Sequence, residues 1–80
     1  MNFSRMRSPT DAMGMETYAA RSGAWQFLIV KDRGRWTTSY RAIDPKGPVS
    51  VASTIEGPFD EFSDAADAAD STLARLKRLS

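Results

Sequence analysis

Apolar and polar residues alternate along the middle of this chain with the period of two that is typical of β-strands. Three runs show the pattern, at residues 24–31, 35–43 and 49–56. Aromatic and β-branched residues dominate the first run, which is too short for a stable helix. The breaks at residues 32–34 and 44–48 contain Gly34, Pro45 and Gly47, residues that favour tight turns. The pattern therefore predicts three consecutive antiparallel strands.

A helical period replaces the strand period over residues 63–79. One apolar stripe runs along it, formed by Ala66, Ala69, Leu73 and Leu76. Ser63 precedes the stripe as an expected N-cap, because its side chain can accept a hydrogen bond from a free backbone N–H. Acidic residues concentrate in the first half and basic residues in the last turns, which suits the helix dipole.

This order of elements predicts an α+β fold, a three-stranded antiparallel β-meander packed on one C-terminal α-helix. A short fourth strand at the edge is a further prediction for residues 15–20. Residues 1–17 show no sustained period and are rich in Ser, Thr, Pro, Gly and Met. We expect them to form a flexible N-terminal tail, and residues 18–80 to form a single β-β-β-α domain.

Strand alternation separates two faces of the expected sheet. Trp36 and Tyr40 share one face, which we expect the helix to cover, while Arg35 and Arg41 share the open face. The expected core is large for a small domain. It consists of Trp25, Phe27, Ile29, Trp36, Tyr40, Val49, Val51, Ile55, Phe59, Phe62, Ala69, Leu73 and Leu76.

Composition limits the chemistry available to these 80 residues. The chain contains no His and no Cys, which excludes thiolate and imidazole nucleophiles, bases and metal ligands. The remaining carboxylates, Lys, Tyr, Ser and Thr form no recognisable catalytic set. We therefore expect a protein that is not an enzyme, with no catalytic, cofactor-binding or metal-binding residues. No apolar run approaches the ~20 residues that span a bilayer, so a cytoplasmic location without membrane contact is expected.

The formal net charge of +1 hides an uneven distribution. Residues 1–41 hold seven Lys and Arg against three acids, whereas residues 56–70 hold six acids and no base. Such polarity could steer a charged partner or favour association between copies, although a solvated surface explains it as well.

The open face offers the best candidate for an interaction surface. Leu28 and Val30 stand side by side there, and exposed apolar neighbours of this kind are typical of contact surfaces. Polar residues of the next strand flank them, so the predicted surface is Leu28, Val30, Arg35, Thr37, Ser39 and Arg41. The expected function is that of a small non-enzymatic module binding an unidentified protein or forming a homodimer through this face or an open strand edge.

Nucleic-acid binding is the alternative. Lys31, Arg33, Arg35 and Arg41 surround Trp36 and Tyr40, and cations with aromatic rings suit phosphates and bases. Alternation sends the two rings to the face opposite Arg35 and Arg41, which weakens this hypothesis.

Several turn motifs of this chain resemble motifs of other proteins. Gly34-Arg35-Trp36 opens the second strand, Asp44-Pro45 and Gly47 follow it, and Gly57-Pro58-Phe59 leads into a helix rich in Ala and Asp. In this order the motifs resemble those of short uncharacterised proteins of proteobacteria. The resemblance implies a meander-plus-helix architecture and a bacterial origin, and no activity.

Overall fold

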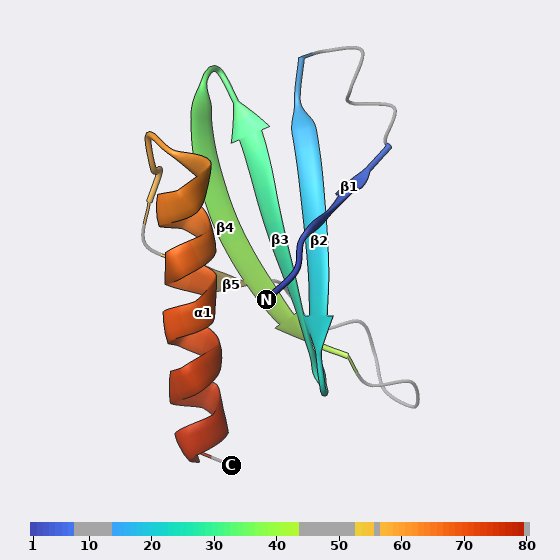
Figure 1. Ribbon diagram of the computed structural model, residues 1–80, viewed down its shortest axis with the longest axis vertical. Coiled ribbons are helices and arrows are strands. Elements are labelled where there is room, and N and C mark those ends of the chain that lie inside the picture. The colour runs from blue at the N-terminus through green and yellow to red at the C-terminus, as the bar shows by residue number, and fades with distance from the viewer. Residues whose placement is uncertain (8–13, 44–52, 56, 80) are drawn as a thin grey trace.

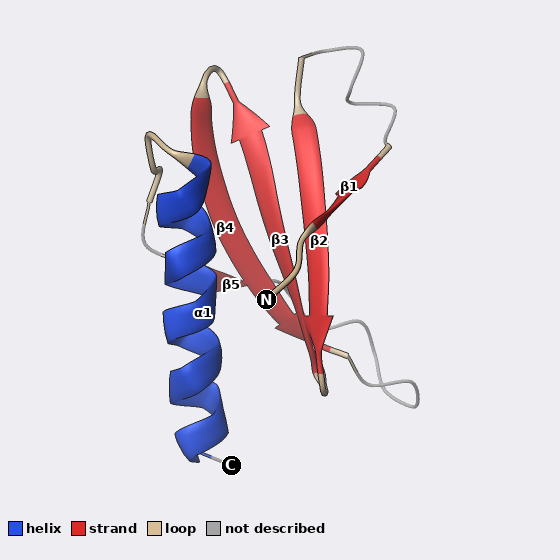
Figure 2. Ribbon diagram, viewed as in Figure 1, coloured by secondary structure: helices blue, strands red, loops and turns tan. Residues whose placement is uncertain are grey.

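The computed structural model is an antiparallel sheet with a helix packed against one side (Figures 1 and 2). The structure describes residues 1–7, 14–43, 53–55 and 57–79. Each strand in these residues pairs with its neighbour in the chain, so the sheet order is β1-β2-β3-β4-β5. The elements are β1 (Ser4–Met6), β2 (Glu16–Ser22), β3 (Trp25–Asp32), β4 (Arg35–Ala42), β5 (Ser53–Thr54) and α1 (Phe62–Leu79).

The expected α+β class and C-terminal helix are confirmed, but the expected number of strands was wrong. The edge strand expected at residues 15–20 is β2, which has seven residues, and β1 adds another strand outside it. Strand β2 crosses the boundary expected after residue 17, and β1 lies inside the expected tail, so residues 4–6 and 16–17 of that tail belong to the sheet. The flexibility of residues 1–17 and the single domain over 18–80 stay predictions.

The third expected strand lies partly outside the described residues. Ser53 and Thr54 form β5 and pair with Tyr40 and Ser39 of β4. Residues 49–52 and residue 56 are outside the described part of the chain, and so are the core positions expected for Val49 and Val51. The described part of this run therefore agrees with an antiparallel strand beside β4.

Two-residue turns close the hairpins on both sides of β3. Arg33 and Gly34 both adopt positive φ, 55° and 79°, which together with the two-residue length indicates a type I′ turn. At the other end, Gly23 has a φ of 59° and opens the turn between β2 and β3. These turns follow the right-handed twist of the strands and fix the register of β2, β3 and β4.

The register confirms the expected separation of the two faces. Trp36 lies on the helix side, where its ring centroid is 5.1 Å from that of Phe62. Tyr40 shares this side and pairs with Phe27 across the sheet. Arg35 and Arg41 occupy the alternate positions of β4 and therefore face away from the helix.

Helix α1 begins one residue earlier than expected. The backbone N–H of Ala65 donates to the carbonyl of Glu61 at 3.3 Å, so Glu61 supplies the first helical acceptor. Ser63, the expected N-cap, therefore lies inside the first turn of the helix.

The buried stripe of α1 is also rotated from its expected position. Its fully buried residues are Ala65, Ala69 and Thr72, whereas Ala66 and Leu73 are half-buried at the flank. The hydroxyl of Thr38 on β4 donates a hydrogen bond to the Ala65 carbonyl at 3.0 Å, so the helix lies close to the strand at this point. So close an approach between helix and strand leaves room for Ala and Thr but crowds Leu.

Aromatic rings fill the space between sheet and helix. All eight aromatic residues lie on this side of the sheet or in the segments beside it: Phe3, Tyr18, Trp25, Phe27, Trp36, Tyr40, Phe59 and Phe62. Of the expected core residues, Phe27, Ile29 and Ala69 are fully buried and the other described ones are half-buried. Ala20, Thr38, Ala65 and Thr72 are buried as well, although the expected core did not include them.

The N-terminal segment completes the covered side. The Phe3 ring meets the Phe62 ring edge-on at 6.1 Å, and the Met1 ammonium lies 3.4 Å from a carboxylate oxygen of Asp70. Figure 1 shows this segment leaving β1 and passing in front of the sheet toward α1. Residues 1–3 therefore contact the helix, while residues 4–6 extend the sheet.

Candidate interaction surface

The sheet face opposite α1, here called the open face, contains all six residues of the interaction surface expected from the sequence. Helix α1 packs on the other side of β3 and β4, and no element within the described ranges lies over the open face. Its described members are Ser4, Met6, Thr17, Ala19, Arg21, Gln26, Leu28, Val30, Asp32, Arg35, Thr37, Ser39, Arg41 and Thr54.

Two uncharged rows cross the middle of the open face. In one row, Leu28 lies between Ala19 and Ser39. In the other, Val30 lies between Thr17 and Thr37. All six side chains are half-buried by their strand neighbours, and none is closed off from solvent. The centre of the face is therefore flat, small in side-chain size and free of charge.

Charged residues lie beyond these rows, at the two ends of the strands. At one end Gln26 stands between Arg21 and Arg41, and its amide oxygen accepts a hydrogen bond from Arg41 Nε at 2.7 Å. At the other end Asp32 lies opposite Arg35, whose Nη2 is 3.0 Å from Asp60 Oδ1. An uncharged centre with charged ends is the usual composition of a protein–protein interface.

Part of this surface escaped the sequence analysis. Met6, Thr17 and Ala19 belong to β1 and β2, which lie wholly or partly in the segment expected to be a tail. Met6 is 45% exposed and extends the Val30 row to the edge of the sheet. The signal that could have revealed them is the alternation of Thr17, Tyr18 and Ala19, with the aromatic ring on one face and small residues on the other.

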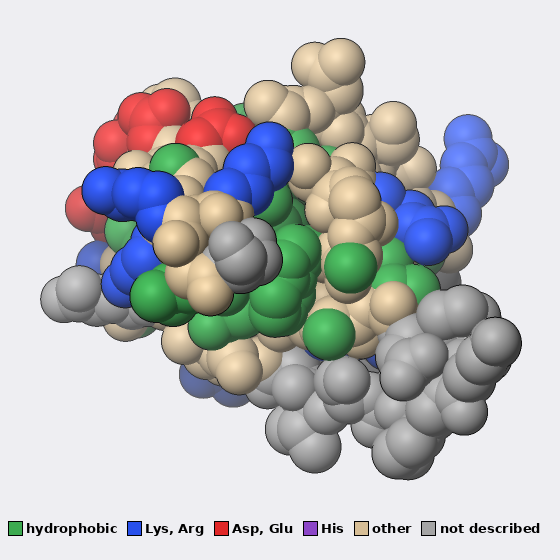
Figure 3. Space-filling model, turned by 90° about the horizontal axis from the view of Figure 1, so that it is seen from below, with side chains coloured by type: hydrophobic (Ala, Val, Ile, Leu, Met, Phe, Trp, Pro, Cys, Tyr) green, Lys and Arg blue, Asp and Glu red, His purple; other side chains and the backbone are tan. Residues whose placement is uncertain are grey.

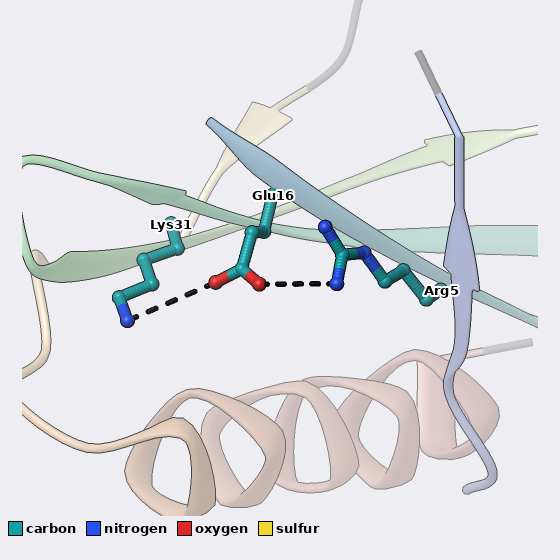
Figure 4. A network of polar contacts seen from close by, with 3 residues as sticks. All are labelled: Arg5, Glu16 and Lys31. Carbon is teal, nitrogen blue, oxygen red and sulfur yellow. Dashed lines mark ion pairs between the residues drawn. The ribbon is translucent and has the colours of Figure 1, made fainter. Parts of the chain in front are cut away.

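The four cations expected to bind nucleic acid do not gather on one surface. Lys31 lies on the helix side, where its Nζ is 3.7 Å from Glu16 Oε2 and 5.3 Å from the centre of the Trp36 ring. Figure 4 shows Glu16 between Lys31 and Arg5, each on a different strand. Lys31 therefore takes part in an internal cross-strand network.

The other three cations are also separated. Arg35 and Arg41 share the open face, but six residues of strand place them about 20 Å apart. Arg33 stands in the tight turn between β3 and β4. Because the aromatic rings lie on the covered side, the open face offers no described ring on which a base could stack.

Within the described residues, both edge strands of the sheet are short. Strand β1 has three residues and the described part of β5 has two, so each offers few backbone groups to an added strand. This favours the open face over an edge as the larger surface for contact.

A different kind of apolar surface appears at the end of the molecule where α1 finishes (Figure 3). Leu79 is 79% exposed there, and the last turn also holds Lys77 and Arg78. This apolar surface adjoins basic side chains, whereas the centre of the open face is uncharged.

Among the residues that the structure covers, no helix is both long and apolar enough to cross a membrane. Comparisons with protein-family models, with curated proteins and with solved structures found no match to this chain.

Proposed function

We propose that this protein is a non-enzymatic interaction module that pairs with a second copy of itself through the open face. The observation that carries the proposal is the pair of uncharged central rows, bounded by Arg21 and Arg41 at one end of the strands and by Asp32 and Arg35 at the other. Two sheets that meet in this way would form a β-sandwich with the helices on its outer sides.

Charge and shape both favour a second copy in one orientation. A two-fold axis lying in the plane of the sheet and perpendicular to the strands places β3 antiparallel on β3. Centred at Ile29, this arrangement sets Leu28 of one copy over Val30 of the other. It also sets Asp32 over Gln26, between the cations Arg21 and Arg41 of the other copy, while Arg35, which is paired with Asp60, lies over Arg41. The opposite arrangement, with parallel strands, would place Asp32 over Asp32 and Arg21 over Arg41.

The size of the face is sufficient for such a pair. Eight strand residues and four strands measure about 26 Å by 19 Å, or about 500 Å² per copy. The total of about 1,000 Å² stands at the lower limit for specific interfaces. We therefore expect a dimer of roughly micromolar affinity rather than a permanent one.

Other functions receive less support from the described geometry. The absence of His and Cys from the sequence removes the commonest catalytic groups, and nucleic-acid binding lacks a continuous basic surface. The expected bacterial origin and cytoplasmic location stay predictions.

Sedimentation equilibrium from about 0.1 µM to 1 mM tests the proposal, because this range brackets the expected affinity of the wild-type protein and that of a variant weakened a hundredfold. Replacing Leu28 by Glu places a carboxylate at the centre of the pair and should weaken association at least about a hundredfold. Ala74→Glu is the matched control, since Ala74 is exposed on the helix and should leave association unchanged. Circular dichroism should show that both variants are folded.

Charge reversal tests the orientation. Asp32→Arg should weaken the dimer, because it places a third cation among Arg21 and Arg41. Adding Arg21→Glu should restore part of the lost affinity. A monomer at 1 mM, or equal association by the Leu28→Glu and wild-type proteins, would contradict pairing through this face. The second of these results would indicate a dimer formed at an edge of the sheet.

A further inference from the structure

A groove lies between α1 and the segment that leads from β5 to the helix. It has a volume of about 590 Å³, which is within the range of small-molecule sites. Its walls come from Tyr40 of β4, from residues 54, 55 and 57–59, and from residues 68, 71, 72 and 75 of α1. The groove opens on the covered side of the molecule, and of its described lining residues Thr54 alone also belongs to the open face.

The groove follows from a change of register at the edge of the sheet. Thr54 pairs with Ser39, but Phe59 pairs with Trp36, so five steps along one segment match three along β4. The segment between these two pairings is therefore two residues longer than the facing part of β4. A side chain at Gly57 would come within 3.1 Å of the Phe59 ring, so a glycine keeps this position open.

Aromatic and aliphatic groups form fixed walls. Tyr40 is held by Phe27, stacked with a centroid distance of 5.8 Å, and by the edge of Trp25 at 5.9 Å. Phe59 is held by two backbone hydrogen bonds with Trp36, at 2.7 and 2.8 Å. These contacts favour a groove that exists before a ligand binds, which lowers the entropic cost of binding.

Within the described part of the chain, one buried hydroxyl of the groove has no hydrogen-bond partner. Thr72 is only 4% exposed and lines the groove, yet none of the described residues makes a hydrogen bond with its side chain. Thr38, the other buried threonine, donates to the Ala65 carbonyl at 3.0 Å. A buried polar group without a partner is costly, and a ligand that supplies one would remove the cost.

The described lining residues of the groove carry one charge, which is positive. Among the described residues, Arg75 stands at the wall of the groove, forms no ion pair and has no acidic neighbour in the lining. Ser71 and Tyr40 add hydroxyl groups nearby. A guanidinium next to an apolar wall suits a ligand with a carboxylate at one end and an apolar body at the other.

We propose that this groove binds a small organic carboxylate, with its charge on Arg75 and its apolar body against Ile55 and Phe59. Thr72 would then hydrogen-bond to an oxygen of the ligand. This assignment is independent of self-association, because no residue of the groove that it uses lies in the central rows of the open face.

Two probes that differ only in charge test the assignment, 3-phenylpropionate and the neutral 3-phenylpropanamide. Amide chemical shifts of ¹⁵N-labelled protein should move saturably at Ile55, Phe59 and Ser71, and the carboxylate should bind about tenfold more tightly than the amide. Arg75→Gln should abolish this preference. Arg78→Gln, at an exposed position of the same helix outside the groove, should retain it.

Thr72→Val provides a second test, and it should weaken carboxylate binding about threefold while a native spectrum shows that the fold is kept. The proposal is refuted if 3-phenylpropionate gives no saturable shifts up to about 20 mM. Equal affinity for both probes, equal loss in Arg75→Gln and Arg78→Gln, or shifts confined to other elements would refute it too. The same titration on Leu28→Glu should give the same affinity whether or not that variant is monomeric.

Discussion

The contact between Phe3 and Phe62 allows a quantitative test of whether the N-terminal segment is part of the folded core. Phe62 is the centre of an aromatic cluster, with ring centroids of Tyr18 at 5.2 Å, Trp36 at 5.1 Å and Phe3 at 6.1 Å. Each edge-on or tilted ring pair contributes about 0.5–1.5 kcal/mol beyond its buried area. Replacing Phe62 by Leu retains most of the volume and removes three such pairs, so it should lower the free energy of unfolding by about 1.5–4.5 kcal/mol.

Phe3→Leu removes a single pair, between half-buried rings, and should cost about 0.5–1 kcal/mol. The double variant loses that pair only once, so its free energy of unfolding should fall by about 0.5–1 kcal/mol less than the sum of the two single losses. A protein of this size has a free energy of unfolding of roughly 4–12 kcal/mol, which makes these differences measurable. Urea unfolding followed by circular dichroism gives each value from the midpoint and the slope.

A second cycle, between Phe3 and Tyr40, serves as the control. Tyr40 contacts the rings of Trp25 and Phe27 and shares no ring partner with Phe3. We expect these two substitutions to add within about 0.3–0.5 kcal/mol. If the Phe3–Phe62 cycle is equally additive, residues 1–3 do not pack on α1 in solution, and the flexible tail expected from the sequence is the better description.

Two further substitutions test local features of the fold. Arg33 has a left-handed backbone conformation, which Asn tolerates better than Arg, so Arg33→Asn should raise the free energy of unfolding by about 0.5–1 kcal/mol. Gly34→Ala should lower it by about 1 kcal/mol for the opposite reason. Thermal unfolding in which both changes lower the midpoint would argue against a type I′ turn. Thr38→Val removes the hydrogen bond to Ala65 and should lower the free energy of unfolding by a net amount of about 1 kcal/mol, after the gain from its apolar burial is included. An unchanged urea midpoint would show that this bond adds nothing to stability.

The sequence predicted those parts of the fold that depend on local alternation. The period of two over β3 and β4 was enough to place Trp36 toward the helix and Arg35 away from it, and Gly34 marked the turn between these strands. The same pattern placed Leu28 and Val30 on the open face. Because strand alternation has only two outcomes, a correct register in one strand fixes the faces of the strands beside it.

Features that depend on distant contacts could not be predicted in this way. Strand β1 has three residues, and its position is determined by pairing with β2 rather than by its own propensity. In α1, Ala65, Ala66 and Ala69 are alike in hydropathy, so sequence alone could not tell which of them faces the sheet. The close contact of Ala65 with Thr38 decided the rotation.

The groove could not be predicted from the sequence for a similar reason. It results from the two extra residues between Thr54 and Phe59, a mismatch that exists only once both segments are paired with β4. Gly57 and Pro58 indicated a turn in the sequence. They did not indicate that α1 would form the opposite wall and bring Arg75 to it.

The placement of every aromatic ring on the helix side has a consequence for how this protein can change through evolution. Substitutions among the small residues of the open face alter no ring contact, so this face can acquire a new partner with little loss of folding free energy. The helix side has no such freedom, since each of its rings supports another. Divergent copies of this chain should therefore keep one side nearly constant while the other drifts.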